Sequence, residues 1–193
     1  LLYSVNFEEF KNLADSGNWT TMGEKFIGIA QGHEKAGADC ILFCANTPHM
    51  VADTVQKNIS ITLIHIAEET AKEIKKQNIT KVGLLGTRFT MEQSFFKERL
   101  LKHGIEAVVP NADHRNFIHD SIFYELGKEI FKPETKKTYL DIIAKLQHEG
   151  AKGIIFGCTE IPLLIKQEDC NIPAFDTTKI HTASAVEFAL GKD

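Results

Sequence analysis

A chain of 193 residues with 43% hydrophobic and 25% charged side chains has the composition of an ordinary globular protein, with room for one domain or two small ones. Its formal net charge of −4 argues against a nucleic-acid-binding protein, which would usually carry a basic face. No apolar run approaches the roughly 20 residues that span a bilayer, so neither a nucleic-acid nor a membrane partner is expected.

Strand and helix patterns alternate along the whole chain. The helix predicted near residue 47 has Thr47 as N-cap and Pro48 at its first position, and Thr90 begins a capping-box pattern with Gln93. The predicted strands cover 1–5, 39–43, 61–64, 82–85, 105–109, 153–156 and 174–175. The predicted helices cover 24–36, 47–58, 66–77, 90–104, 114–148 with a break near Pro133, 161–167 and 181–190. This alternation predicts an α/β fold with parallel sheets.

Two stretches of the sequence resemble each other. EKAGADCILFCANTPHM at 34–50 and QHEGAKGIIFGCTEIPLL at 147–164 each contain a helix end, a glycine, an apolar strand and a Cys-x-x-x-Pro pattern. The repeat favours two similar α/β halves. The alternative is that the two stretches are alike by chance or share only the residue pattern common to βα units.

Cys44 and Cys158 each lie where a predicted buried strand meets a predicted helix. Ligands of parallel α/β sheets gather at the carboxyl ends of strands, and helix N-termini favour anions. The same environment is expected to favour the thiolate form of both cysteines. Two thiols on opposite sides of a substrate carbon suit proton removal from one face and proton return to the other, with one base ionised and one acid neutral.

The simpler interpretation of a free cysteine is a small buried hydrophobe. We predict that role for Cys40 inside its strand, and we predict that Cys170 is a loop thiol. The four cysteines lack C-x-x-C spacing, which favours reduced thiols in a cytoplasm over a disulfide framework.

The cysteine segments also carry a family resemblance. FCANTPHM and GCTEIPLL resemble the two cysteine motifs of the pyridoxal-phosphate-independent aspartate/glutamate racemases. YSVNF, LLGTRFTME and FDTTKIH are similar to the early strand, the central Gly-Thr segment and the C-terminal signature of that family. The resemblance covers essentially the whole chain in order. The family's Gly-Gly-Met-Ser-type loop is absent, so we expect that about one strand and one helix precede Leu1 in the natural protein.

The resemblance implies two pseudo-symmetric, Rossmann-like, three-layer domains with the active site between them, often in a homodimer. The first domain would contain 1–60 and 172–193, without its N-terminal strand and helix, and the second would contain 61–171. No cofactor and no metal are implied. The substrate would be a small acidic amino acid, aspartate or glutamate.

The resemblance also implies roles for individual residues. Cys44 and Cys158 would be the two acid/base residues. Six others would bind substrate, and two would tune the thiols: Ala45, Asn46, Thr47, Thr87, Lys128 and Thr159 in the first role, Glu160 and His181 in the second. Thr47 and Thr87 have ordinary structural alternatives, as an N-cap and as a turn residue.

Three departures from the family pattern bear on the substrate. Met50 replaces a common Lys, and Asn6 replaces a common Asp. Lys128 aligns with a lysine that binds the distal carboxylate in some aspartate racemases, but the partner arginine aligns near Phe10. A broader acidic or neutral amino-acid range is therefore an open alternative.

Other functions were weighed from the same residues. Hydantoin racemase, maleate isomerase and arylmalonate decarboxylase types remain alternatives within the superfamily, and a non-catalytic amino-acid-binding protein is an alternative outside it. His114 and His119 lie five residues apart, so they do not share one helix face as metal ligands would. A thiol hydrolase built on Cys44 and His49 would leave the second cysteine motif unexplained.

Overall fold

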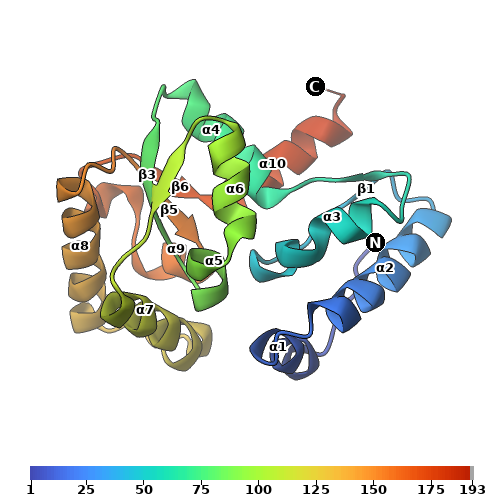
Figure 1. Cartoon of the computed structure of the whole chain (residues 1–193), viewed down its shortest axis with the longest axis horizontal. Coiled ribbons are helices and arrows are strands. Elements are labelled where there is room, and N and C mark those ends of the chain that lie inside the picture. Colours follow the sequence, from blue (N-terminus) through green and yellow to red (C-terminus); the bar gives the residue numbers. More distant parts are fainter. Residues whose placement is uncertain (192–193) are drawn as a thin grey trace. The chain divides into compact units, whose positions relative to one another are not determined.

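The computed structural model describes residues 1–191, which form two compact units. The first unit contains 1–43 and 48–65, and the second contains 44–47 and, of the described residues, 66–191. Figure 1 labels the elements of both units. Beyond the start of the chain, helices alternate with parallel strands, which confirms the α/β class.

The first unit combines three helices with a short two-stranded sheet among the described residues. β1 pairs in parallel with β2, and α2 packs against both α3 and β1. Its elements are α1 (Phe7–Asp15), α2 (Trp19–Lys35), β1 (Cys40–Ile41), the 3-10 helix η1 (Thr47–Val51), α3 (Ala52–Gln56) and β2 (Thr62–Leu63).

The start of the chain differs from the prediction. Residues 1–5 form no strand, and Leu1, Leu2 and Tyr3 are exposed. The helix α1, which was not predicted, follows directly, because Asn6 Oδ1 accepts hydrogen bonds from the N–H groups of Glu8 and Glu9 and so caps its first turn. The apolar residues at the start of the chain thus have no strand to pair with, whereas the Asn6 cap lies within the helix's own sequence.

Aromatic rings form a continuous row inside the first unit. Phe26 lies 4.7 Å from both Phe10 and Phe43, measured between ring centroids. The row continues from Phe43 to His49 and from His49 to His65, at 5.4 Å and 4.7 Å. These rings join α1, α2, β1, η1 and the end of β2 into one core.

The second unit is a three-layer α/β arrangement. Its four-stranded parallel sheet has the order β4-β3-β5-β6. Its strands are β3 (Lys81–Gly86), β4 (Glu106–Val108), β5 (Ile154–Gly157) and β6 (Ala174–Asp176). Its helices are α4 (Ile66–Lys76), α5 (Arg88–Glu92), α6 (Ser94–Lys102), α7 (Ala112–Tyr124), η2 (Leu126–Lys128), α8 (Pro133–His148), α9 (Ile161–Leu164), η3 (Gln167–Asp169) and α10 (Thr177–Ala189).

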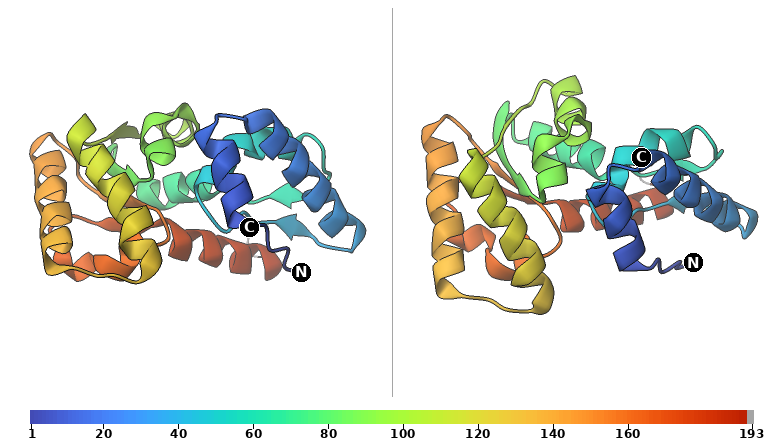
Figure 2. Two further views of the ribbon diagram at one scale, coloured as in Figure 1. Left: turned by 90° about the horizontal axis from the view of Figure 1, so that it is seen from below. Right: turned by 60° about the horizontal axis from the view of Figure 1, so that its bottom comes forward.

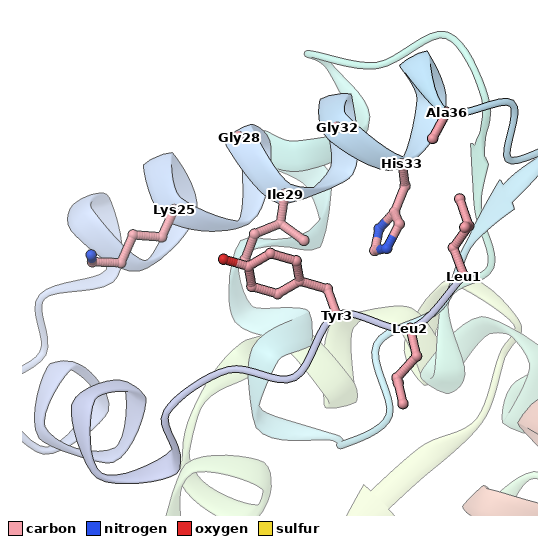
Figure 3. Close-up of a pocket in the computed structure, with 9 residues that line it drawn as sticks. All are labelled: Leu1, Leu2, Tyr3, Lys25, Gly28, Ile29, Gly32, His33 and Ala36. Carbon is pink, nitrogen blue, oxygen red and sulfur yellow. The ribbon is translucent and has the colours of Figure 1, made fainter.

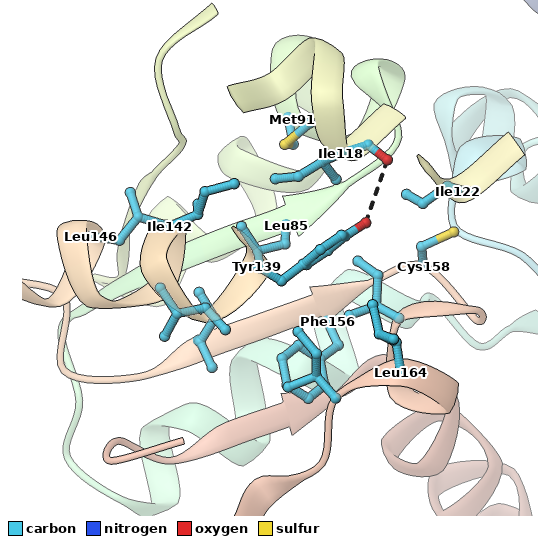
Figure 4. Packing of buried hydrophobic residues seen from close by; sticks show 14 of the residues in the cluster. Leu85, Met91, Ile118, Ile122, Tyr139, Ile142, Leu146, Phe156, Cys158 and Leu164 are labelled. Carbon is cyan, nitrogen blue, oxygen red and sulfur yellow. Dashed lines mark hydrogen bonds between the residues drawn. The ribbon is translucent and has the colours of Figure 1, made fainter. Parts of the chain in front are cut away.

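Alternate residues of β3 and β5 point to opposite helical layers. Leu85 and Phe156 lie in a cluster with residues of α7, α8 and α9, whereas Leu84 and Ile155 lie in a cluster with residues of α4 and α6. Figure 2 shows α7 and α8 side by side, and Figure 4 shows the first cluster around Tyr139. The core of this unit therefore fills both faces of its sheet.

The last part of the chain belongs with a different unit from the one expected. We assigned 172–193 to the first domain, but β6 pairs with β5 and α10 packs against α4. The described part of this segment therefore completes the sheet of the second unit; residues 192 and 193 lie outside the described residues. The apolar strand Ala174–Asp176 finds its hydrogen-bonding partner at the β5 edge, which sequence spacing alone does not specify.

Candidate active site

Three parallel strands of the second unit end at one edge of the sheet. Gly86 of β3 pairs with Gly157 of β5, and the neighbouring register joins Phe156 of β5 to Asp176 of β6. The residues that follow these strands are Thr87, Cys158 and Thr177. Two predicted site residues, from segments far apart in the sequence, are therefore brought to the same carboxyl edge, where α/β proteins bind ligands.

Gly86 and Gly157 pair across β3 and β5, and Thr87 and Cys158 are the next residues along the chain. A Cβ added at Gly86 would lie 2.7 Å from the Gly157 carbonyl oxygen, and one added at Gly157 would lie 2.7 Å from the Leu85 carbonyl oxygen. Thr90 packs over both glycines, with side-chain atoms at 3.0–3.1 Å from the added Cβ positions. Side chains are thus excluded here for steric reasons, and the functional groups begin one residue later.

The segment Cys44–Thr47 is held against this edge by the side chains of Asn46 and Thr47. Asn46 Nδ2 donates to Thr177 Oγ1 over 3.2 Å, and Thr177 Oγ1 donates to the Phe156 carbonyl over 2.9 Å. The hydroxyl groups of Thr47 and Thr87 lie 3.3 Å apart. The structure therefore brings Asn46, Thr47 and Thr87 together, and Ala45 lies half-buried in the same segment.

Thr87 also begins α5. Its Oγ1 accepts a hydrogen bond from the N–H of Thr90 at 3.4 Å, which makes Thr87 the N-cap of that helix. The capping-box prediction placed the helix start at Thr90, three residues too late. Thr87 therefore has a structural role in its turn and also lies beside Thr47, and its predicted part in substrate binding stays a prediction.

Cys158 is buried and bonded to Glu160. Its Sγ donates to Glu160 Oε2 over 2.8 Å, and the Thr159 hydroxyl donates to the same oxygen over 2.8 Å. Figure 4 shows Cys158 in the cluster that contains Tyr139, whose hydroxyl donates to the Ile118 carbonyl over 3.4 Å. Burial and proximity therefore link this thiol to both a carboxylate and the apolar core.

The protonation of Cys158 corrects a prediction. We expected the helix start to favour a thiolate, but burial, followed by the charge of Glu160 and its hydrogen bond, raises the pKa of Cys158 well above its ordinary value. The backbone N–H groups of Glu160 and Thr159 act in the opposite direction and are outweighed. Cys158 is therefore a neutral thiol near pH 7.

The other predicted residues occupy different positions. Cys44 is exposed, at the start of the held segment. His181 is buried in the second turn of α10. Lys128 is exposed on η2, with Nζ 5.8 Å from the centroid of the Tyr124 ring.

Thr177 is a site residue that the sequence analysis did not select. It follows a short strand, as Thr87 and Cys158 do, and Asp176 caps the helix that it begins. Its position in the FDTTKIH segment was visible, but the bond to Asn46 depends on the fold.

The described residues were also compared with the ligand sets that metal ions need. Within residues 1–191, no group of three or more His, Cys, Asp and Glu side chains lies close enough to hold a metal ion.

A pocket of about 430 Å³ in the first unit lies between residues 1–3 and one face of α2, and it contains none of the predicted site residues (Figure 3). No described helix is both long and apolar enough to cross a membrane.

Comparison with known proteins gives the family. The sequence model of the Asp/Glu/hydantoin racemases matches residues 1–185. The chain belongs to this family. It is therefore an isomerase of the racemase type, and the resemblance seen in the cysteine segments is confirmed.

Individual relatives agree with the family. A proposed Asp/Glu racemase from Yersinia pestis has a crystal structure with a TM-score of 0.93 and 44% identity, covering 98% of this chain and 83% of that one. An aspartate racemase homologue from Pyrococcus horikoshii OT3 has a TM-score of 0.87 and 38% identity over the same shares of the two chains. The broad specificity amino-acid racemase RacX of Bacillus subtilis is 26% identical over 86% of this chain and 71% of its own length.

Proposed function

We propose that this racemase interconverts the L- and D-forms of a small acidic amino acid without a cofactor, by proton transfer at Cα between Cys44 and Cys158. One cysteine, as thiolate, removes the Cα proton, and the electron pair passes into the substrate carboxylate as an enediolate. The other cysteine, as thiol, donates its proton to the opposite face of Cα. Each turnover therefore exchanges the protonation states of the two cysteines.

The observation that carries the proposal is the way the Cys44 segment joins the sheet edge that bears Cys158. Asn46 and Thr47, two and three residues after Cys44, bond to Thr177 and Thr87 of that edge. The raised pKa of Cys158 supports its role as the neutral acid before proton transfer. The amide and hydroxyl groups provide donors for the substrate carboxylate and for the charge that develops on it.

The choice of substrate is a separate part of the proposal. The family name and the names of the Yersinia and Pyrococcus proteins favour aspartate or glutamate. The relative from Bacillus subtilis carries a broad specificity name, which favours a wider range as the second candidate. The homodimer and the cytoplasmic location implied by the sequence remain predictions.

Single cysteine variants of the full-length protein test the mechanism. Cys44→Ser and Cys158→Ser should each lower kcat for racemisation by about 10²–10⁴-fold, because each removes one of two required proton-transfer groups. Cys40→Ser and Cys170→Ser are matched controls, since both positions are free thiols outside the proposed site, and they should keep near wild-type rates. Wild-type racemisation by either Cys44→Ser or Cys158→Ser would refute the two-thiol mechanism.

A non-catalytic binding protein is the alternative from another class. Such a protein would bind aspartate or a similar acid without exchange of the α-proton. Proton NMR of the Cα–H signal in D₂O separates the two functions, because only the racemase makes that signal disappear.

A further inference from the structure

His119 contacts the turn that carries Thr87. The Nδ1 atom of His119, on α7, accepts a hydrogen bond from the backbone N–H of Arg88 over 3.2 Å. Arg88 is the first residue of α5 and directly follows Thr87, and α5 packs against α7 (Figure 1). The first N–H groups of a helix have no partner within the helix, so His119 supplies one from a different element.

This bond completes the support of the Thr87 turn. On one side, Gly86 is paired in the sheet; within the turn, Thr87 Oγ1 accepts from the N–H of Thr90. On the other side, His119 holds the N–H of Arg88. The Thr87 hydroxyl is then placed 3.3 Å from that of Thr47, in the segment that begins with Cys44.

The imidazole itself is held by neighbouring rings. Its centroid lies 4.8 Å from that of Phe123 and 6.2 Å from that of Phe89, with the Phe89 ring at 81° to it. Two roles are therefore separable by substitution: a phenylalanine keeps a ring between these neighbours but removes the acceptor. An asparagine keeps an acceptor atom near the place of Nδ1 but removes the ring.

We propose that His119 is a positioning residue for racemisation: by holding the Arg88 N–H, it fixes the Thr87 hydroxyl for the substrate carboxylate. This inference rests on the proposed function, in which Thr87 supports carboxylate binding. An interaction of this kind acts equally on the bound substrate and the transition state, so its loss raises KM and leaves kcat unchanged. A purely structural residue would instead lower the amount of folded enzyme, which lowers apparent kcat and leaves KM unchanged.

Steady-state kinetics of full-length variants test the inference. His119→Phe should raise KM about tenfold, and His119→Asn should restore KM to within about threefold of wild type, because one hydrogen bond is lost in the first and kept in the second. His119→Gln, with its acceptor displaced by one methylene, is a second variant without the bond and should resemble His119→Phe. It replaces that variant if His119→Phe does not fold. Wild-type KM in the folded Phe or Gln variant, or a failure of Asn to restore KM, would overturn the inference.

Hydrogen exchange supplies a readout that needs no activity. The Arg88 amide should exchange about tenfold faster in His119→Phe and His119→Gln than in wild type and His119→Asn. Equal exchange in all four proteins would overturn the contact itself. Absence of racemisation by the wild-type protein would overturn the proposed function and the catalytic part of this inference, whereas wild-type racemisation with unchanged KM in the variants would overturn this inference alone.

Discussion

At the scale of single residues, Cys158 and Glu160 form a hydrogen-bonded pair in the candidate site. The carboxylate lies 2.8 Å from the sulfur and adds to the effect of burial, which is the largest cause of the raised pKa. A carboxylate in this position keeps the proton on the thiol, because its negative charge would repel a thiolate. Without that charge the thiol would lose its proton more readily. Glu160 therefore sets how readily Cys158 donates.

Removing this charge should lower the pKa of Cys158. In Glu160→Gln we expect the pKa of Cys158 to fall, and to stay above its ordinary value because burial is unchanged. The measurement is the pH dependence of Cys158 alkylation by iodoacetamide, followed by peptide mass spectrometry in a Cys44→Ser background. Glu98→Gln, on the exposed side of α6, is the control and should leave the profile unchanged. An unaltered profile in Glu160→Gln would show that the carboxylate does not affect the thiol.

Lys128 allows a test of substrate choice. If its exposed ammonium group binds the distal carboxylate, Lys128→Met should raise KM for aspartate by about 10- to 100-fold, the effect of losing a charged hydrogen bond. KM for neutral amino acids should not change. Lys137→Met, an exposed lysine paired with Asp141 on α8, is the matched control. A proportional change for acidic and neutral substrates would remove Lys128 from the specificity proposal.

At the scale of elements, the Gly86–Gly157 pairing is the feature that brings the ends of β3 and β5 together. Gly157→Ala should reduce the free energy of unfolding by roughly 1–3 kcal/mol, because the new methyl group would meet the Leu85 carbonyl oxygen. Gly28→Ala, in the middle of α2 with nothing within 4 Å of its added Cβ, should instead increase that free energy by up to about 1 kcal/mol. Urea unfolding measures both. Equal effects of the two substitutions would contradict the steric account of the pair.

The same scale shows what the sequence could predict. Strands with buried, apolar runs, such as 82–85 and 153–156, were located within one residue at each end, because a run of this kind between glycine and polar residues has few alternatives. The predicted strand at 1–5 was wrong, since an apolar composition does not supply a strand partner. The helix α1 was missed although its apolar residues Phe10, Leu13 and Ala14 follow a helical spacing after the cap residue Asn6.

Some features of the candidate site could likewise be predicted from the sequence, and others could not. The cysteine, asparagine and threonine residues were identifiable because a reactive or hydrogen-bonding side chain at the end of a buried strand has a restricted set of roles. The part played by Thr177 and the protonation of Cys158 were not predictable, because both depend on distances and burial set by strand pairing. The assignment of 172–193 to a domain could not be made from the sequence for the same reason, since the pairing of β6 with β5 is a long-range choice.

At the scale of the whole molecule, the two units have different contents. The four-stranded sheet, Cys158 and the Cys44–Thr47 segment all belong to the second unit, whereas the aromatic row and the pocket beside α2 belong to the first. The match to the Asp/Glu/hydantoin racemases runs through both units, over residues 1–185. Racemisation is therefore a property to be measured on the full-length protein rather than on the second unit alone.

The most direct test of the central claim is incubation of the full-length protein in D₂O with a panel of L- and D-amino acids, analysed by chiral chromatography with mass detection. We predict that at least one acidic amino acid forms its opposite enantiomer without added cofactor, and that the product carries one deuterium at Cα. Inversion without deuterium, or the absence of inversion and of Cα exchange across the whole panel, would contradict proton transfer at Cα.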